Sequence, residues 1–137
     1  MRKLPFAALL TTLALSPAWP HHSAAVYYQL DKQVTVEGVV TRVELGNPHV
    51  RIYVNVKRSD GTDNEWVAEG GSRSALLRKG WTGEEVRPGD ALTVFGNPAR
   101  DGSNVVHWQR LSRADGTQLW SEGSPVLDEL RPRPNGE

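Results

Sequence analysis

Apolar and polar residues alternate over most of the chain after residue 30, a pattern typical of half-buried β-strands. The segment "VRIYVNVK" (50–57) alternates without a break. One face is aliphatic, and the other carries Arg51, Tyr53, Asn55 and Lys57. We expect the aliphatic face to point into a core and the polar face to point outward.

The segment "QVTVEGVVTRVEL" (33–45) predicts a longer strand with a change of face. Val34 and Val36 share one face before Gly38, and the apolar alternation after it is carried by Val39, Val43 and Leu45. A change of face at a glycine inside a strand is typical of a bulge or sharp bend. We therefore expect a first strand that bends at Gly38 and serves both halves of a barrel.

The remaining pattern predicts further strands at 64–69, 91–96, 105–112 and 118–120. Asp-Gly pairs in the intervening segments favour tight turns, because they tolerate positive φ angles. "RSALLRKG" (73–80) predicts a short helix with Ser72 or Ser74 as its N-cap and Gly80 as its stop. Arg73, Arg78 and Lys79 make the helix basic, and we interpret this cluster as a solvated face.

This element order predicts an all-β domain with one short helix, a five-stranded OB-like small barrel of the type β-β-β-α-β-β. An immunoglobulin-like sandwich is the alternative, but it would require about seven strands. The chain has five tryptophans. We expect Trp66, Trp81, Trp108 and Trp120 to fill the core and the barrel ends, rather than to stack on bases or sugars.

The first residues predict export. Arg2 and Lys3 precede the largely apolar run "LPFAALLTTLALS", which is too short to span a bilayer, and small residues end at Ala18. We expect four segments: a signal peptide (1–18), a lead-in (19–32), the OB-like barrel (33–121) and a disordered tail (122–137). Cleavage after Pro20 is a second option that would expose His21.

Composition narrows the class of protein. The chain has no cysteine, so its core rather than disulfides must supply stability. Its formal net charge of +0 falls to near −2 once Arg2 and Lys3 are removed. Nucleic acid and anionic membranes usually require a basic surface, so we expect neither as a partner, and no later segment is apolar enough to span a membrane. Together with the predicted signal peptide, this composition leads us to expect a periplasmic or secreted location.

Several short motifs resemble one family. They are "HHS" (21–23), "NPH" (47–49), "EGGS" (69–72), "LLRKGW" (76–81), "RPGD" (87–90) and "DGTQLW" (115–120). Together they resemble a family of small exported bacterial proteins classed as a domain of unknown function. The resemblance spans residues 21 to about 120 and implies export and a small barrel-like domain. It implies no activity.

Two candidate sites follow from the residues. Arg51 and Tyr53, on the outer face of the second strand, are the candidate ligand contacts. His21, His22 and His49 are the candidate metal ligands, because neutral imidazole suits copper or zinc. If His21 became the first residue, its amine and ring could chelate copper, and His49 could complete the site. The competing interpretation is that these histidines are solvated or turn residues.

No nucleophile elbow, paired-carboxylate spacing or glycine-rich phosphate loop is present in the sequence. We therefore expect a small exported binding or accessory module rather than an enzyme, with a small molecule or a periplasmic protein as its partner and no certain cofactor. The alternative is a periplasmic copper- or zinc-binding protein.

Overall fold

A computed structural model of the chain describes residues 24–121. Its elements are α1 (Ala24–Tyr27), β1 (Val34–Glu44), β2 (Arg51–Lys57), β3 (Asp63–Glu69), α2 (Arg73–Arg78), β4 (Ala91–Pro98), β5 (Val105–Arg113) and β6 (Gln118–Ser121). The predicted strands and the helix α2 are confirmed to within a residue or two at each end. The expected signal peptide, His21, His22 and the expected tail lie outside the described residues.

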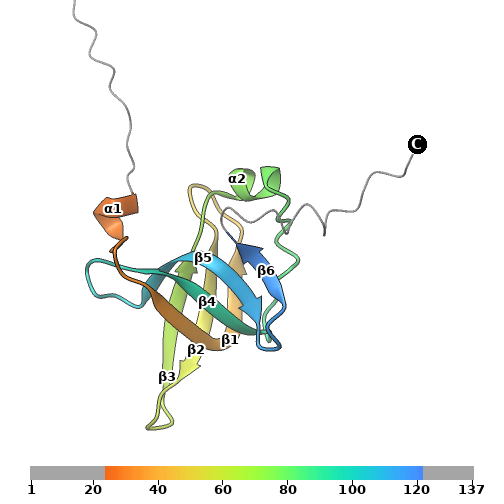
Figure 1. The fold of residues 1–137 in the computed structure, drawn as a ribbon. Helices are drawn as coiled ribbons and strands as arrows, with labels where there is room; N and C mark the ends of the chain where they lie inside the picture. Colours follow the sequence, from red (N-terminus) through yellow and green to blue (C-terminus); the bar gives the residue numbers. More distant parts are fainter. Residues whose placement is uncertain (1–23, 122–137) are drawn as a thin grey trace, which may run out of the picture.

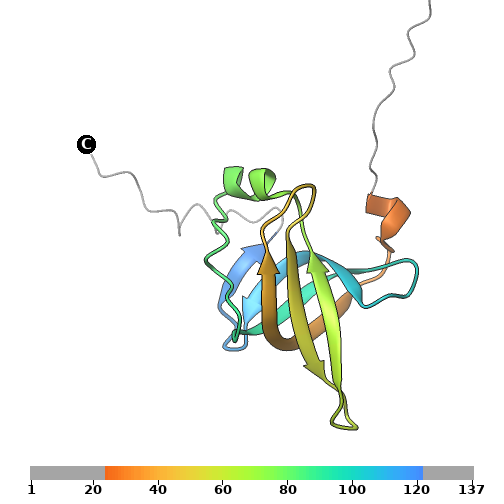
Figure 2. The same ribbon diagram turned by 180° about the vertical axis from the view of Figure 1, so that it is seen from behind.

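The strands form one sheet in the order β3-β2-β1-β4-β5-β6 (Figure 1). A parallel pairing of β3 with β5 closes five of them into a barrel, and β6 adds to the edge of β5. Helix α2 lies across one end of this barrel, as Figure 2 shows from behind. The expected OB-like barrel is therefore confirmed, and its closure as one sheet excludes the two-sheet sandwich.

Strand β1 joins the two halves of the barrel. Its residues 34–39 pair with β4, and its residues 39–44 pair with β2, with a bulge between Val40 and Arg42. The prediction that the face changes at Gly38 is wrong. The inward face continues through Gly38 to Val40, which is 2% exposed, and Val39 is 47% exposed. Gly38 allows close approach instead, because a Cβ there would collide with the backbone oxygen of Asn55.

The core is aliphatic in the barrel and aromatic at the end covered by α2. Ile52 and Val54 of β2 are fully buried, as the alternation predicted. The expectation that the tryptophans belong to the core is also confirmed. Trp66 is half-buried and packs against the core cluster, and the other three are buried: Trp81, Trp108 and Trp120. The Trp81 and Trp108 ring centroids lie 6.2 Å apart.

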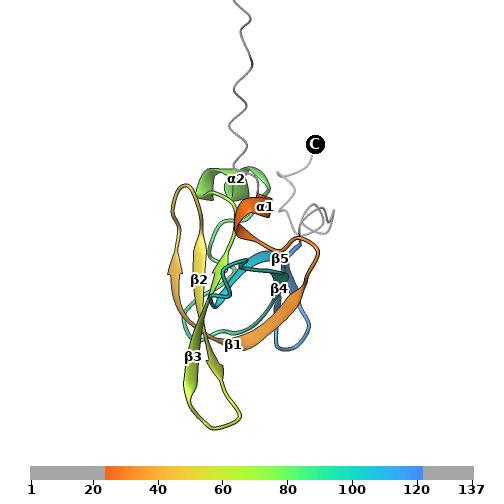
Figure 3. The ribbon, with the colours of Figure 1, turned by 90° about the vertical axis from the view of Figure 1, so that its left-hand side faces the viewer.

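The segment before β1 is an ordered arm on the barrel. Helix α1 lies toward the same end of the molecule as α2 (Figure 3). The Arg100 guanidinium donates hydrogen bonds to the carbonyls of Ala25 and Tyr28, at 3.1 and 3.2 Å. The buried Asn97 amide donates to the Lys32 carbonyl at 2.6 Å. Within residues 24–121, no helix is long and apolar enough to cross a membrane.

Candidate functional site

Arg51 extends from β2 on the outer face of the barrel and is exposed. Its Nε and Nη2 atoms donate to one carboxylate oxygen of Glu69, at 3.1 and 3.0 Å. Glu69 is the residue opposite Arg51 in the antiparallel β2–β3 pair. The arginine is therefore held in one orientation by a cross-strand partner, with about half of its side chain exposed to solvent.

Tyr53 lies two residues along the same face and is half-buried. Its hydroxyl donates to Glu44 at 3.0 Å, and the Arg42 guanidinium lies 3.7 Å above its ring centroid. Arg42 also pairs with Glu44 at 2.6 Å. Burial, and then the hydrogen bond to Glu44, raises the pKa of Tyr53. We call the five residues Arg42, Glu44, Arg51, Tyr53 and Glu69 the charged face.

The arm reaches this face through a residue that the sequence analysis did not single out. The Tyr28 hydroxyl donates to the second carboxylate oxygen of Glu69. The ring of Tyr28 lies 5.0 Å from that of His107, which is opposite Glu69 in the parallel β3–β5 pair. Burial, together with the bond to Glu69, raises the pKa of Tyr28. Glu69 thus links β2, β3 and the arm.

Glu69 and Tyr28 were not among the predicted site residues, and they differ in whether the sequence could have identified them. The Asp-Gly turn at 60–61 fixes the hairpin register, and counting back from it places Glu69 opposite Arg51. Nothing local identifies Tyr28, because its contacts come from strands more than forty residues away.

His49 is the one candidate metal ligand among the described residues. It is exposed, and its Nδ1 lies 2.9 Å from the Gly70 carbonyl oxygen. Because a carbonyl can only accept, Nδ1 donates in this contact, and Nε2 is the ring nitrogen that a metal would use. Between residues 24 and 121, no three His, Cys, Asp or Glu side chains are grouped to hold a metal ion.

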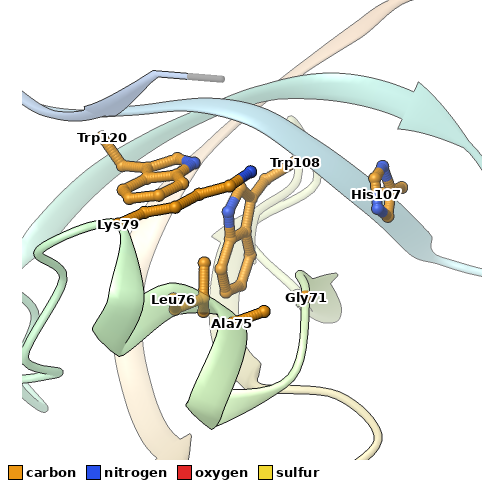
Figure 4. Close-up of a pocket in the computed structure, with 7 residues that line it drawn as sticks. All are labelled: Gly71, Ala75, Leu76, Lys79, His107, Trp108 and Trp120. Atoms are coloured by element: carbon orange, nitrogen blue, oxygen red, sulfur yellow. The ribbon is translucent and has the colours of Figure 1, made fainter. Parts of the chain in front are cut away.

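A small pocket lies between α2 and the barrel (Figure 4). It encloses about 80 Å³, and we call it the helix pocket; it is lined by Gly71, Ala75, Leu76, Lys79, His107, Trp108 and Trp120. Figure 4 shows the Lys79 side chain extending from α2 between the two indole rings. The Lys79 ammonium lies 5.9 Å from the Trp120 ring centroid, a cation–π distance.

Comparison with known proteins identifies a family for this chain, and that family has no known activity. No curated protein matches this chain. A model of a family of unknown function matches residues 9–107, from before α1 into β5. That match covers most of the chain and all the residues of the charged face. The chain therefore belongs to the family of unknown function DUF6152.

Proposed function

We propose that this protein is an exported binding module that recognises a protein partner through the charged face. The observation that carries the proposal is two neighbouring contact clusters on the charged face. Arg42, Glu44 and Tyr53 contact one another at 2.6–3.7 Å. Arg51 pairs with Glu69 at 3.0 Å, and the strand register places Arg51 opposite Glu44, so the two clusters lie side by side. Exposed ion pairs contribute little to stability, so the main physical effect of these contacts is to hold charges in a fixed pattern. Fixed complementary charges favour recognition and fast association.

A protein partner suits this surface better than a small molecule. The charged face alternates positive and negative groups across neighbouring strands, and small-molecule sites are usually concave and mostly apolar. The absence of catalytic motifs from the sequence supports a binding role over an enzymatic one. The apolar run after Arg2 and Lys3 supports export to the periplasm.

Site-specific photo-crosslinking tests this proposal. A photo-reactive amino acid replaces Tyr53 in the protein expressed with its own leader, and a matched variant carries it at the exposed Thr117, in the β5–β6 turn. We expect a discrete crosslinked product from position 53, none from position 117, and loss of that product when Arg51→Glu is added. Equal products from both positions, or none from position 53, would contradict the proposal.

One observation favours metal binding as a second candidate function. Metal-ligating histidines commonly donate their other ring N–H to a backbone carbonyl, and His49 has this arrangement with Gly70. Copper or zinc would then be held by His49 together with His21 and His22. Native mass spectrometry of the periplasmic protein from copper-grown cells tests this. We expect one bound copper, which His49→Ala removes; a metal-free chain after copper addition would exclude the site.

A further inference from the structure

The helix pocket is a second concave feature that the charged face does not include. Buried apolar side chains supply much of its wall, because Trp108 is 3%, Trp120 4% and Leu76 4% exposed, and Lys79 and His107 supply polar groups. Each water-sized atom needs roughly 15 Å³ of such space, so 80 Å³ accommodates about five non-hydrogen atoms. That is smaller than a nucleoside or a sugar ring and matches a short carbon chain with a polar end.

Among the side chains that line the helix pocket there is a cationic group and no carboxylate. Lys79 brings an ammonium group to the pocket, and no acidic residue is among the lining side chains. Helix α2 adds Arg73 and Arg78, and its sequence RSALLR contains no carboxylate. The Lys79 ammonium lies over the Trp120 ring and forms no ion pair with the residues between 24 and 121. A ligand with one negative charge would complement this site.

Two glycines shape the wall from which α2 starts. A Cβ on Gly70 would enter the Trp108 ring, so this glycine lets the end of β3 lie directly against the indole. At Gly71, which lines the pocket, an added Cβ would come no closer than 3.9 Å to its neighbours. The helix pocket thus lies beside the closely packed Trp108 indole, and Gly71 leaves this space open because it has no side chain.

We propose that the helix pocket binds the carboxylate of a short aliphatic acid of propionate size. The carbon chain lies against Trp108 and the carboxylate pairs with the Lys79 ammonium. The inference is independent of the charged face, since the two surfaces share no residue. Either can fail without the other.

The test compares two ligands of the same shape and different charge. The ¹⁵N-labelled mature protein is titrated with sodium propionate and with propionamide at constant ionic strength, and the indole N–H signals of Trp108 and Trp120 are followed. We expect saturable shifts with propionate, with a dissociation constant on the order of 1 mM for so small a ligand. We expect propionamide to bind about fivefold more weakly, the upper range for an exposed charge pair.

Three variants separate the site from general charge effects. Lys79→Met lowers the affinity for propionate about fivefold, whereas Arg78→Met, on the same helix but outside the pocket lining, leaves it unchanged. Ala75→Leu fills the pocket and abolishes the shifts while the rest of the spectrum keeps its folded dispersion. Equal affinity for the acid and the amide, equal effects of the two charge variants, or shifts without saturation would each overturn the proposal.

Discussion

At the scale of single residues, the adjacent glycines 70 and 71 meet very different surroundings. Gly70→Ala would place a methyl group inside the Trp108 ring, whereas Gly71→Ala would make ordinary contacts at 3.9 Å or more. We expect Gly70→Ala to lower the free energy of unfolding by about 3 kcal/mol, through overpacking, and Gly71→Ala to change it by less than about 0.5 kcal/mol. Urea denaturation of both variants checks this. Equal losses would show that Trp108 moves aside.

Tyr28 gives the protein a pH dependence at the alkaline end. Burial and the bond to Glu69 raise its pKa above the ordinary 10.0, so the folded protein keeps it neutral where the unfolded chain ionises. The unfolded state then binds fewer protons than the native state. The contribution of Tyr28 to the free energy of unfolding is complete below about pH 10. It is lost as the pH rises above this value, by up to about 1.4 kcal/mol per pH unit.

Urea midpoints of the native protein and Tyr28→Phe, measured between about pH 8 and pH 11, test this expectation. The native protein should lose stability more steeply with pH than the variant does. Tyr53, whose pKa is also raised, contributes the same slope to both proteins. Parallel curves would show that Tyr28 ionises equally in the folded and unfolded chains.

At the scale of elements, the start of α2 depends on one hydroxyl. The Ser72 side chain accepts a hydrogen bond from the Ala75 amide at 3.2 Å, so Ser72 is the N-cap and Ser74, the other predicted candidate, is not. We expect Ser72→Ala to cost about 1 kcal/mol and Ser74→Ala to stay within about 0.5 kcal/mol of the native protein. Thermal unfolding followed by circular dichroism measures both. A larger loss at Ser74 would reverse the assignment.

At the scale of the whole molecule, closure by β3 and β5 makes the two halves one folding unit. Val54 of β2 and Val94 of β4 are both fully buried, one in each half. We expect Val54→Ala and Val94→Ala each to cost about 2 kcal/mol and to shift the tryptophan-fluorescence and circular-dichroism transitions together. Two separated transitions in either variant would mean that the halves unfold independently.

Much of the fold was predictable because strand patterns and turns are local properties. The alternation at 50–57 identified the inward side of β2, and the Asp-Gly pair at 60–61 identified the hairpin to β3. The same local logic failed in β1. Apolar residues at 39, 40 and 43 permit two phases, and only the pairing with β2 places the bulge after Val40 rather than at Gly38.

The sequence by itself determined the order of the elements, the aliphatic face of β2 and the exposed position of Arg51, since these follow from a period of two and from turn chemistry. Only the tertiary structure decided that Tyr28 bonds to Glu69 and that Trp108, Trp120 and Lys79 enclose one pocket. The physical reason is distance along the chain. These groups meet only when β3 pairs with β5 and the barrel closes, and no local pattern records that pairing.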